Sequence, residues 1–203
     1  MRKCHLIKLH AKFVVETYLL VQAFESPLIN DVCTLAHRSC REACVIRLND
    51  AWARFCRQLI IQSAACHAIT FSGRVVPLAP NINVPSEVIP RLLAINNWKY
   101  EPRWHDATIC IQAARDLKIN NYFDVSAGIG LSPSPLEDLR RVRNFLAHRT
   151  KGTARQMEKV AKLLQLSPRT SVDDLLQTYV PPGLTTFSKW VSEMQLMSEL
   201  SIQ

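Results

Sequence analysis

Apolar residues recur every three or four positions along most of the chain, which is the spacing of amphipathic helices. The spacing predicts helices over residues 6–24, 28–47, 50–69, 86–95, 106–117, 134–149, 153–166, 172–179 and 184–200. Asn49 or Asp50 offers a side-chain cap for the third of these helices. The second and third helices could also form one long helix with a break near this pair.

Proline and glycine predict the interruptions between the helices. Four prolines favour a loop over residues 75–90, and a glycine-containing stretch favours another over residues 126–131. Ser134 is the expected N-cap of the helix that follows, with Pro135 at its first helical position. Gly152 is expected to end or bend that helix.

The pattern as a whole predicts an all-α fold, an antiparallel helical bundle over residues 1–170 with a C-terminal helical appendage over residues 171–203. Only 5 glycines stand against 11 prolines, which argues against a many-turned β-sandwich. The chain contains no G-x-G-x-x-G and no G-x-x-x-x-G-K, so phosphate-cradling loops of those two kinds are excluded.

The charge balance points to a polyanionic partner. The 25 Lys and Arg residues outnumber the 17 Asp and Glu residues and give a formal net charge of +8. Nucleic acid is the first expectation from this excess, and an acidic membrane surface is the second. The longest charge-free run, residues 58–73, is too short and too polar to span a bilayer, and no secretory signal is recognisable. We therefore expect a cytoplasmic protein whose seven cysteines are reduced.

One helical segment carries candidate chemistry on the face away from its apolar stripe. Leu139, Val142 and Leu146 fall on one side of a helix at about 100° per residue. His148 lies about 200° from Leu146, and Asn144 precedes His148 by four positions, so both face outward. Arg143 lies at the flank of this face. The ordinary interpretation of His148 is an exposed histidine near a helix C-terminus, where positive charge is favourable.

The string Arg143-Asn144-Phe145-Leu146-Ala147-His148, late in a helical bundle, resembles the R-x4-6-H motif of the HEPN superfamily. Many members of that superfamily are endoribonucleases that need no metal or other cofactor. The resemblance implies that Arg143 binds the scissile phosphate, that His148 is the general acid and base, and that Asn144 orients one of them. It also implies a 2′,3′-cyclic phosphate product and an active site formed across a homodimer.

This chemistry is physically coherent. RNA carries its own nucleophile, the 2′-hydroxyl. Cleavage then needs a proton carrier that titrates near neutral pH, for which imidazole is suited, and a cation for the charge that develops on the phosphate. The residue two positions after the motif histidine is Thr150, whereas some HEPN toxins have a tyrosine there that an antitoxin modifies. A toxin without that antitoxin, or a nuclease with a defence-system partner, is therefore expected.

Other residues could contact RNA or support the site. The candidates that surround the motif are Arg140, Arg141, Arg149 and Lys151. The candidates in the aromatic loop over residues 96–104 are Trp98, Lys99 and Arg103, because alternating bases and aromatic rings can bind unpaired nucleotides. Asp50 could help position the catalytic pair. The ordinary alternatives are a solvated basic face, a loop held by buried tryptophans, and a helix cap.

One helical face carries four residues of types that bind metals, namely Cys33, His37, Cys40 and Cys44. They span about 16 Å at 1.5 Å per residue, so one zinc ion cannot bind all four. We predict a packed core stripe and no metal, although two of them together with Cys56 or Cys66 could form a zinc site. The alternatives to a nuclease are a non-catalytic HEPN-like module that binds RNA or protein, and a zinc-stabilised regulatory helical domain.

Overall fold

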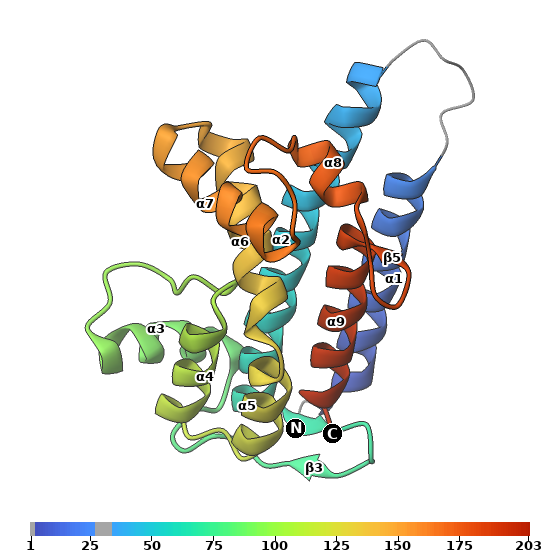
Figure 1. Cartoon of the computed structure of the whole chain (residues 1–203). Helices are drawn as coiled ribbons and strands as arrows, with labels where there is room; N and C mark the ends of the chain where they lie inside the picture. The colour runs from blue at the N-terminus through green and yellow to red at the C-terminus, as the bar shows by residue number, and fades with distance from the viewer. Residues whose placement is uncertain (1–2, 27–33) are drawn as a thin grey trace. The chain divides into compact units, whose positions relative to one another are not determined.

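The computed structural model describes residues 3–26 and 34–203. The described part is predominantly helical, which confirms the all-α prediction, and its elements are shown in Figure 1. The helices are α1 (Leu6–Glu25), α2 (Thr34–Ala65), α3 (Pro85–Asn96), α4 (Ala107–Asp116), α5 (Tyr122–Gly130), α6 (Pro133–His148), α7 (Lys151–Leu163), α8 (Val172–Gln177) and α9 (Thr186–Leu200). In residues 3–26 and 34–203, every helix is too short or too polar to cross a bilayer.

The described chain divides into two compact units. The first comprises residues 3–14, 52–133 and 195–203, and the second comprises residues 15–26, 34–51 and 134–194. Helices α1, α2 and α9 each contribute residues to both units. The sequence predicts a different boundary, at residue 170, between a helical bundle and a C-terminal appendage. That boundary stays a prediction.

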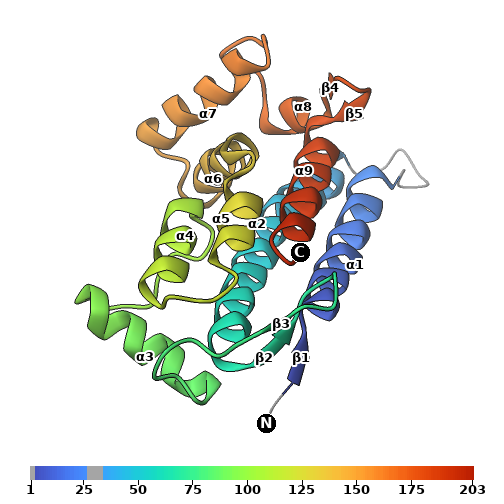
Figure 2. The same ribbon diagram turned by 90° about the horizontal axis from the view of Figure 1, so that it is seen from below.

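The first unit contains a small sheet that the helical pattern did not predict. Its strands are β1 (Lys3–His5), β2 (His67–Ile69) and β3 (Val75–Val76), which lie side by side in Figure 2. Strand β1 pairs in parallel with β2, which pairs in antiparallel fashion with β3. Cys4 lies beside Ala68 in the sheet, and Phe13 further along α1 meets Trp52 and Phe55 earlier in α2, so the start of α1 and the end of α2 run in opposite directions. Phe13, Trp52 and Phe55 pack between them with ring centroids 5.2–5.7 Å apart.

Helix α2 is one continuous helix of 32 residues, so the single-helix alternative is right and the predicted break is wrong. Asn49 is buried inside it and Asp50 lies on its exposed side, so neither residue caps a helix. Val45, Leu48 and Trp52 are buried at helical spacing on either side of this pair. Burial of such side chains outweighs the helix penalty of about 0.5–0.7 kcal/mol for each of the two polar residues. The predicted start at residue 28 lies outside the described residues.

The second unit is held by contacts among segments that are far apart in the sequence. The ring of Phe24 stacks on that of Phe187 at 4.4 Å, and the Arg41 guanidinium lies 5.5 Å from the Phe24 centroid. Arg41 also donates to both oxygens of Asp173 at 3.1 Å. A short hairpin of β4 (Tyr179–Val180) and β5 (Leu184–Thr185) leads into α9. The sequence pattern predicted the break between the helices over 172–179 and 184–200, but it assigned the strand residues Tyr179, Leu184 and Thr185 to the ends of those helices.

Residues 126–131 are not a loop, which corrects the expectation from their glycines. Val125, Gly128 and Ile129 are buried at helical spacing within α5. Gly128 is required for a close approach: a Cβ there would lie 2.7 Å from the Cα of Ser201 and even closer to the Ser201 backbone nitrogen. This glycine therefore permits packing between two segments rather than flexibility.

Replacing Gly128 by alanine is expected to lower the free energy of unfolding by ~3 kcal/mol, because the backbone of Ser201 must move. The matched control is Gly130→Ala two positions later, where the nearest atom, Ile111 Cδ1, lies at an ordinary 3.6 Å. Denaturant unfolding of both variants measures the difference. Equal stability of the two variants would contradict this packing.

Candidate functional site

Helix α6 carries the Arg-Asn-x-x-x-His string and begins two residues earlier than predicted. Pro133 takes its first position, and Pro135 is buried in its first turn. The segment contains two consecutive Ser-Pro pairs, so the start signal was present twice and the first copy is used. Ser134, the predicted cap, instead hydrogen-bonds to the carboxyl group of Asp138.

The end of α6 follows from the two residues after His148. Arg149 adopts the left-handed conformation at φ +45°, and its backbone N–H donates to Phe145 O at 2.8 Å. Thr150 then caps α7, with its Oγ1 accepting from the N–H of Thr153 at 3.2 Å. Gly152 lies inside α7, so the expectation that it ends α6 is wrong: the threonine cap sets the break. His148 is consequently the last residue of α6.

The predicted orientation of α6 is confirmed for Leu139 and Val142, which are buried, and for His148, which is exposed. Leu146, predicted on the apolar stripe, and Asn144, predicted on the outward face, are both half-buried. Among residues 3–26 and 34–203, no side chain forms a hydrogen bond with the His148 ring. The imidazole is therefore open to solvent and accessible to a ligand.

Arg143 has an unusual environment. Its side chain is half-buried, and its Nη1 donates to Asn144 Oδ1 at 3.3 Å. Its Nε is buried without a hydrogen-bond partner in the described part of the chain. A buried donor without a partner costs free energy unless a ligand or water satisfies it. The structure thus brings Arg143 and Asn144 together, whereas His148 lies about 140° further round the helix from Arg143.

Two of the basic residues around the motif are already paired. Arg141 donates to Glu137 Oε2 and Asp138 Oδ1 at 2.9 Å each, and Arg149 donates to Glu42 Oε2 at 2.9 Å. Burial raises the pKa of Asp138, and Arg141 partly opposes that shift. A phosphate at either arginine must compete with these carboxylates. Lys151 is exposed and Arg140 is half-buried. RNA contacts by these four residues stay a prediction.

A pocket of about 270 Å³ lies beside the motif, on another flank of α6. Phe145 and Arg149 line it together with Arg38, Glu42 and Arg169. Neither His148 nor Arg143 is among its lining residues. The pocket therefore adjoins the candidate catalytic residues without containing them.

The chain was compared with known proteins. No family model, curated protein or solved structure matches it.

The aromatic loop belongs to the first unit, while the motif belongs to the second. Trp98 is half-exposed, and Arg103 is exposed. Lys99 lies 5.3 Å from the Tyr100 ring centroid. Trp104 is buried and donates from Nε1 to Glu101 Oε1 at 2.8 Å, which holds the loop. RNA contacts by Trp98, Lys99 and Arg103 stay a prediction, as does support of the catalytic pair by the exposed Asp50.

The Cys and His stripe on α2 is only partly a core stripe. Cys44 is buried, His37 is half-buried and Cys40 is exposed, while Cys33 lies outside the described residues. Burial and the neighbouring Cys40 raise the pKa of Cys44 to about 11, so its thiolate form is disfavoured. Within the described ranges, no three His, Cys, Asp or Glu side chains are grouped to hold a metal ion.

Sequence analysis missed one group of polar residues. Lys8 and Lys12 on α1, and Gln58 and Gln62 on α2, line a common pocket in the first unit. Each pair is spaced by four positions, which places its members on one helical face. That spacing was visible in the sequence, but the pairing of the two helices was not.

Proposed function

We propose that the protein is a metal-independent endoribonuclease of HEPN type that acts as a toxin or an antiviral-defence effector. The observation that supports this most strongly is the surroundings of the Arg143 and His148 side chains on α6. Arg143 has a buried N–H for which the described part of the chain provides no partner, and it donates a hydrogen bond to Asn144; His148 ends the same helix in solvent. A phosphate oxygen is the kind of acceptor that the guanidinium lacks.

In the proposed reaction, His148 takes the proton of a ribose 2′-hydroxyl. The freed 2′-oxygen forms a bond to the adjacent phosphorus, and the bond from phosphorus to the 5′-oxygen breaks. An imidazolium donates a proton to that leaving oxygen. The products are a 2′,3′-cyclic phosphate and a 5′-hydroxyl, and no metal ion takes part.

Arg143 is proposed to bind the phosphate that is attacked. Its planar guanidinium can form two parallel hydrogen bonds with phosphate oxygens. The hydrogen bond from Arg143 to Asn144 would hold the fork in one orientation, so Asn144 is a positioning residue. Fixed donors of this kind stabilise charge that develops in the transition state.

A homodimer would complete the site. His148 and Arg143 lie about 140° apart on α6, so a second copy of α6 could supply the complementary group to the same phosphate. One copy's imidazole would act as the base and the other's imidazolium as the acid. A sedimentation mass equal to one 23.1 kDa chain would contradict this shared site.

The chemistry of the products tests the proposal. In excess EDTA, the protein is expected to cut a single-stranded RNA and leave a 2′,3′-cyclic phosphate, as measured by mass spectrometry of the fragments. An RNA with 2′-deoxyribose throughout is the control and should stay intact, because it lacks the nucleophile. Cleavage that requires added Mg²⁺ or Mn²⁺, or that leaves 5′-phosphate ends, would contradict the proposal.

The second candidate is a non-catalytic HEPN-like module that binds RNA or protein. The ion pairs of Arg141 and Arg149 favour it, because they reduce the free positive charge around His148. The pocket beside the motif favours it too, because neither His148 nor Arg143 lines that pocket. RNA binding without any cleavage of the bound RNA, by folded wild-type protein, would decide for this candidate.

A further inference from the structure

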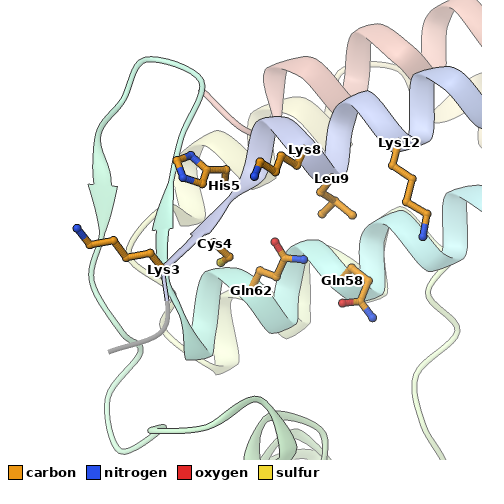
Figure 3. A pocket seen from close by; sticks show the side chains of 8 residues that line it. All are labelled: Lys3, Cys4, His5, Lys8, Leu9, Lys12, Gln58 and Gln62. Carbon is orange, nitrogen blue, oxygen red and sulfur yellow. The ribbon is translucent and has the colours of Figure 1, made fainter.

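A second polar pocket lies entirely within the first unit, apart from the residues of the proposed nuclease site. It has a volume of about 380 Å³ and is formed by β1, the start of α1 and the end of α2 (Figure 3). Ligand pockets of proteins commonly measure 300–1,000 Å³. The volume therefore suits a small molecule rather than an extended polymer.

The charged side chains that line this pocket are all basic. Lys3, Lys8 and Lys12 line it together with His5, and no carboxylate side chain does. Within residues 3–26 and 34–203, none of these three lysines forms an ion pair. By contrast, Arg41 and Arg57 each pair with an acidic side chain. The pocket thus presents uncompensated positive charge, which attracts an anion.

The opposite wall of the pocket provides uncharged hydrogen-bonding groups. Gln58 and Gln62 are four positions apart on α2 and half-buried. Neither amide group has a hydrogen-bond partner within the described ranges. Figure 3 shows Lys12 and Gln62 extending into the space between α1 and α2. An anion that also carries an uncharged polar part would use both walls.

The walls are held in place by the fold. Lys3 and Cys4 belong to β1, whose pairing with His67 and Ala68 of β2 fixes the start of α1 against the end of α2. Behind them, Phe13 packs against Trp52 and Phe55. Leu9 adds an apolar contact to the pocket floor. Pre-formed walls reduce the ordering cost of binding.

We infer that this pocket binds an adenine nucleotide, with its phosphates on Lys8 and Lys12 and its base on Gln58 and Gln62. Lysine is a common point-charge partner of phosphate. A glutamine amide can donate to and accept from the N7 and N6 edge of adenine at the same time. Guanine is most often read by arginine or lysine. No arginine lines the pocket, and its lysines are assigned to the phosphates, which leaves the two glutamines for the base.

Isothermal titration of the full chain with ATP in EDTA at low salt tests this inference. Wild type is expected to bind ATP saturably. Lys8→Gln/Lys12→Gln should weaken binding by roughly tenfold or more for each lysine, because charge-assisted hydrogen bonds are lost. Lys159→Gln, which removes an exposed lysine on α7, is the matched control and should bind like wild type. Both altered lysines are exposed, so unchanged melting temperatures should accompany these results.

Two further titrations distinguish an adenine nucleotide from a free polyphosphate and from a guanine nucleotide. Tripolyphosphate and GTP should each bind at least tenfold more weakly than ATP, and Gln58→Met/Gln62→Met should remove that difference. The inference is overturned if wild type does not bind ATP at millimolar concentration, if the lysine double variant binds it as tightly as wild type, or if tripolyphosphate binds as tightly as ATP. Binding of a single-stranded RNA but not of ATP would overturn it as well. The altered residues are not those of the nuclease proposal, so each proposal can fail alone.

Discussion

His148→Ala should lower the rate of RNA cleavage by a factor of about 10²–10⁴, the usual contribution of a positioned acid or base. The change removes the only group that we propose to move a proton between the 2′-hydroxyl and the leaving oxygen. His148 is exposed and ends α6, so its removal should leave the fold intact. Initial rates on an end-labelled single-stranded RNA in EDTA measure the effect.

The control for this variant is Lys159→Ala, an exposed basic residue on the neighbouring helix α7. It removes a positive charge without touching the motif and should cut RNA at the wild-type rate. Comparable rates for His148→Ala and wild type, with equal melting temperatures, would remove His148 from the mechanism.

Arg143→Ala should lower kcat by about 10²–10³, the usual cost of losing one fixed donor to developing negative charge. Arg143→Lys should recover only part of this loss, because an ammonium group keeps the charge but lacks the planar fork. Because Arg143 is half-buried, the melting temperature of each variant has to be measured beside its kcat and KM. A rise in KM alone would place Arg143 in RNA binding rather than in transition-state stabilisation.

Arg91→Ala serves as the matched arginine control, since Arg91 is exposed on α3 in the first unit. Its cleavage rate should equal that of wild type. Loss of the same size in Arg91→Ala and Arg143→Ala would show that general positive charge, rather than the motif, determines the rate.

Helical spacing predicted most elements of the fold, and its errors have a common cause. Local rules place helix ends and loops at polar residues and glycines, whereas burial in the tertiary structure determines where these helices actually continue. Asn49 and Asp50 looked like a cap, yet α2 continues through them because buried residues flank them on the same stripe. Gly128 looked like loop flexibility, yet it allows the backbone of Ser201 to approach α5.

The orientation of α6 could be predicted from sequence, because the buried Leu139 and Val142 determine where His148 points. The ion-pair partners of the surrounding basic side chains could not be predicted from sequence. Arg149 pairs with Glu42, which is 107 positions away. The Nε of Arg143 is buried by the packing of the chain, and none of residues 3–26 and 34–203 accepts its hydrogen bond. The basic pocket likewise needs residues 3–12 and 58–62 to meet, which depends on the pairing of β1 with β2.

The most direct measurement of the central claim is the RNA cleavage rate of the double variant Arg143→Ala/His148→Ala in excess EDTA, beside wild type and Lys159→Ala. The account predicts that wild type and Lys159→Ala cut at the same rate. It predicts that the double variant is about as slow as the slower single variant, because the two groups act on one phosphate. Undiminished cleavage by a folded, dimeric double variant would contradict the account.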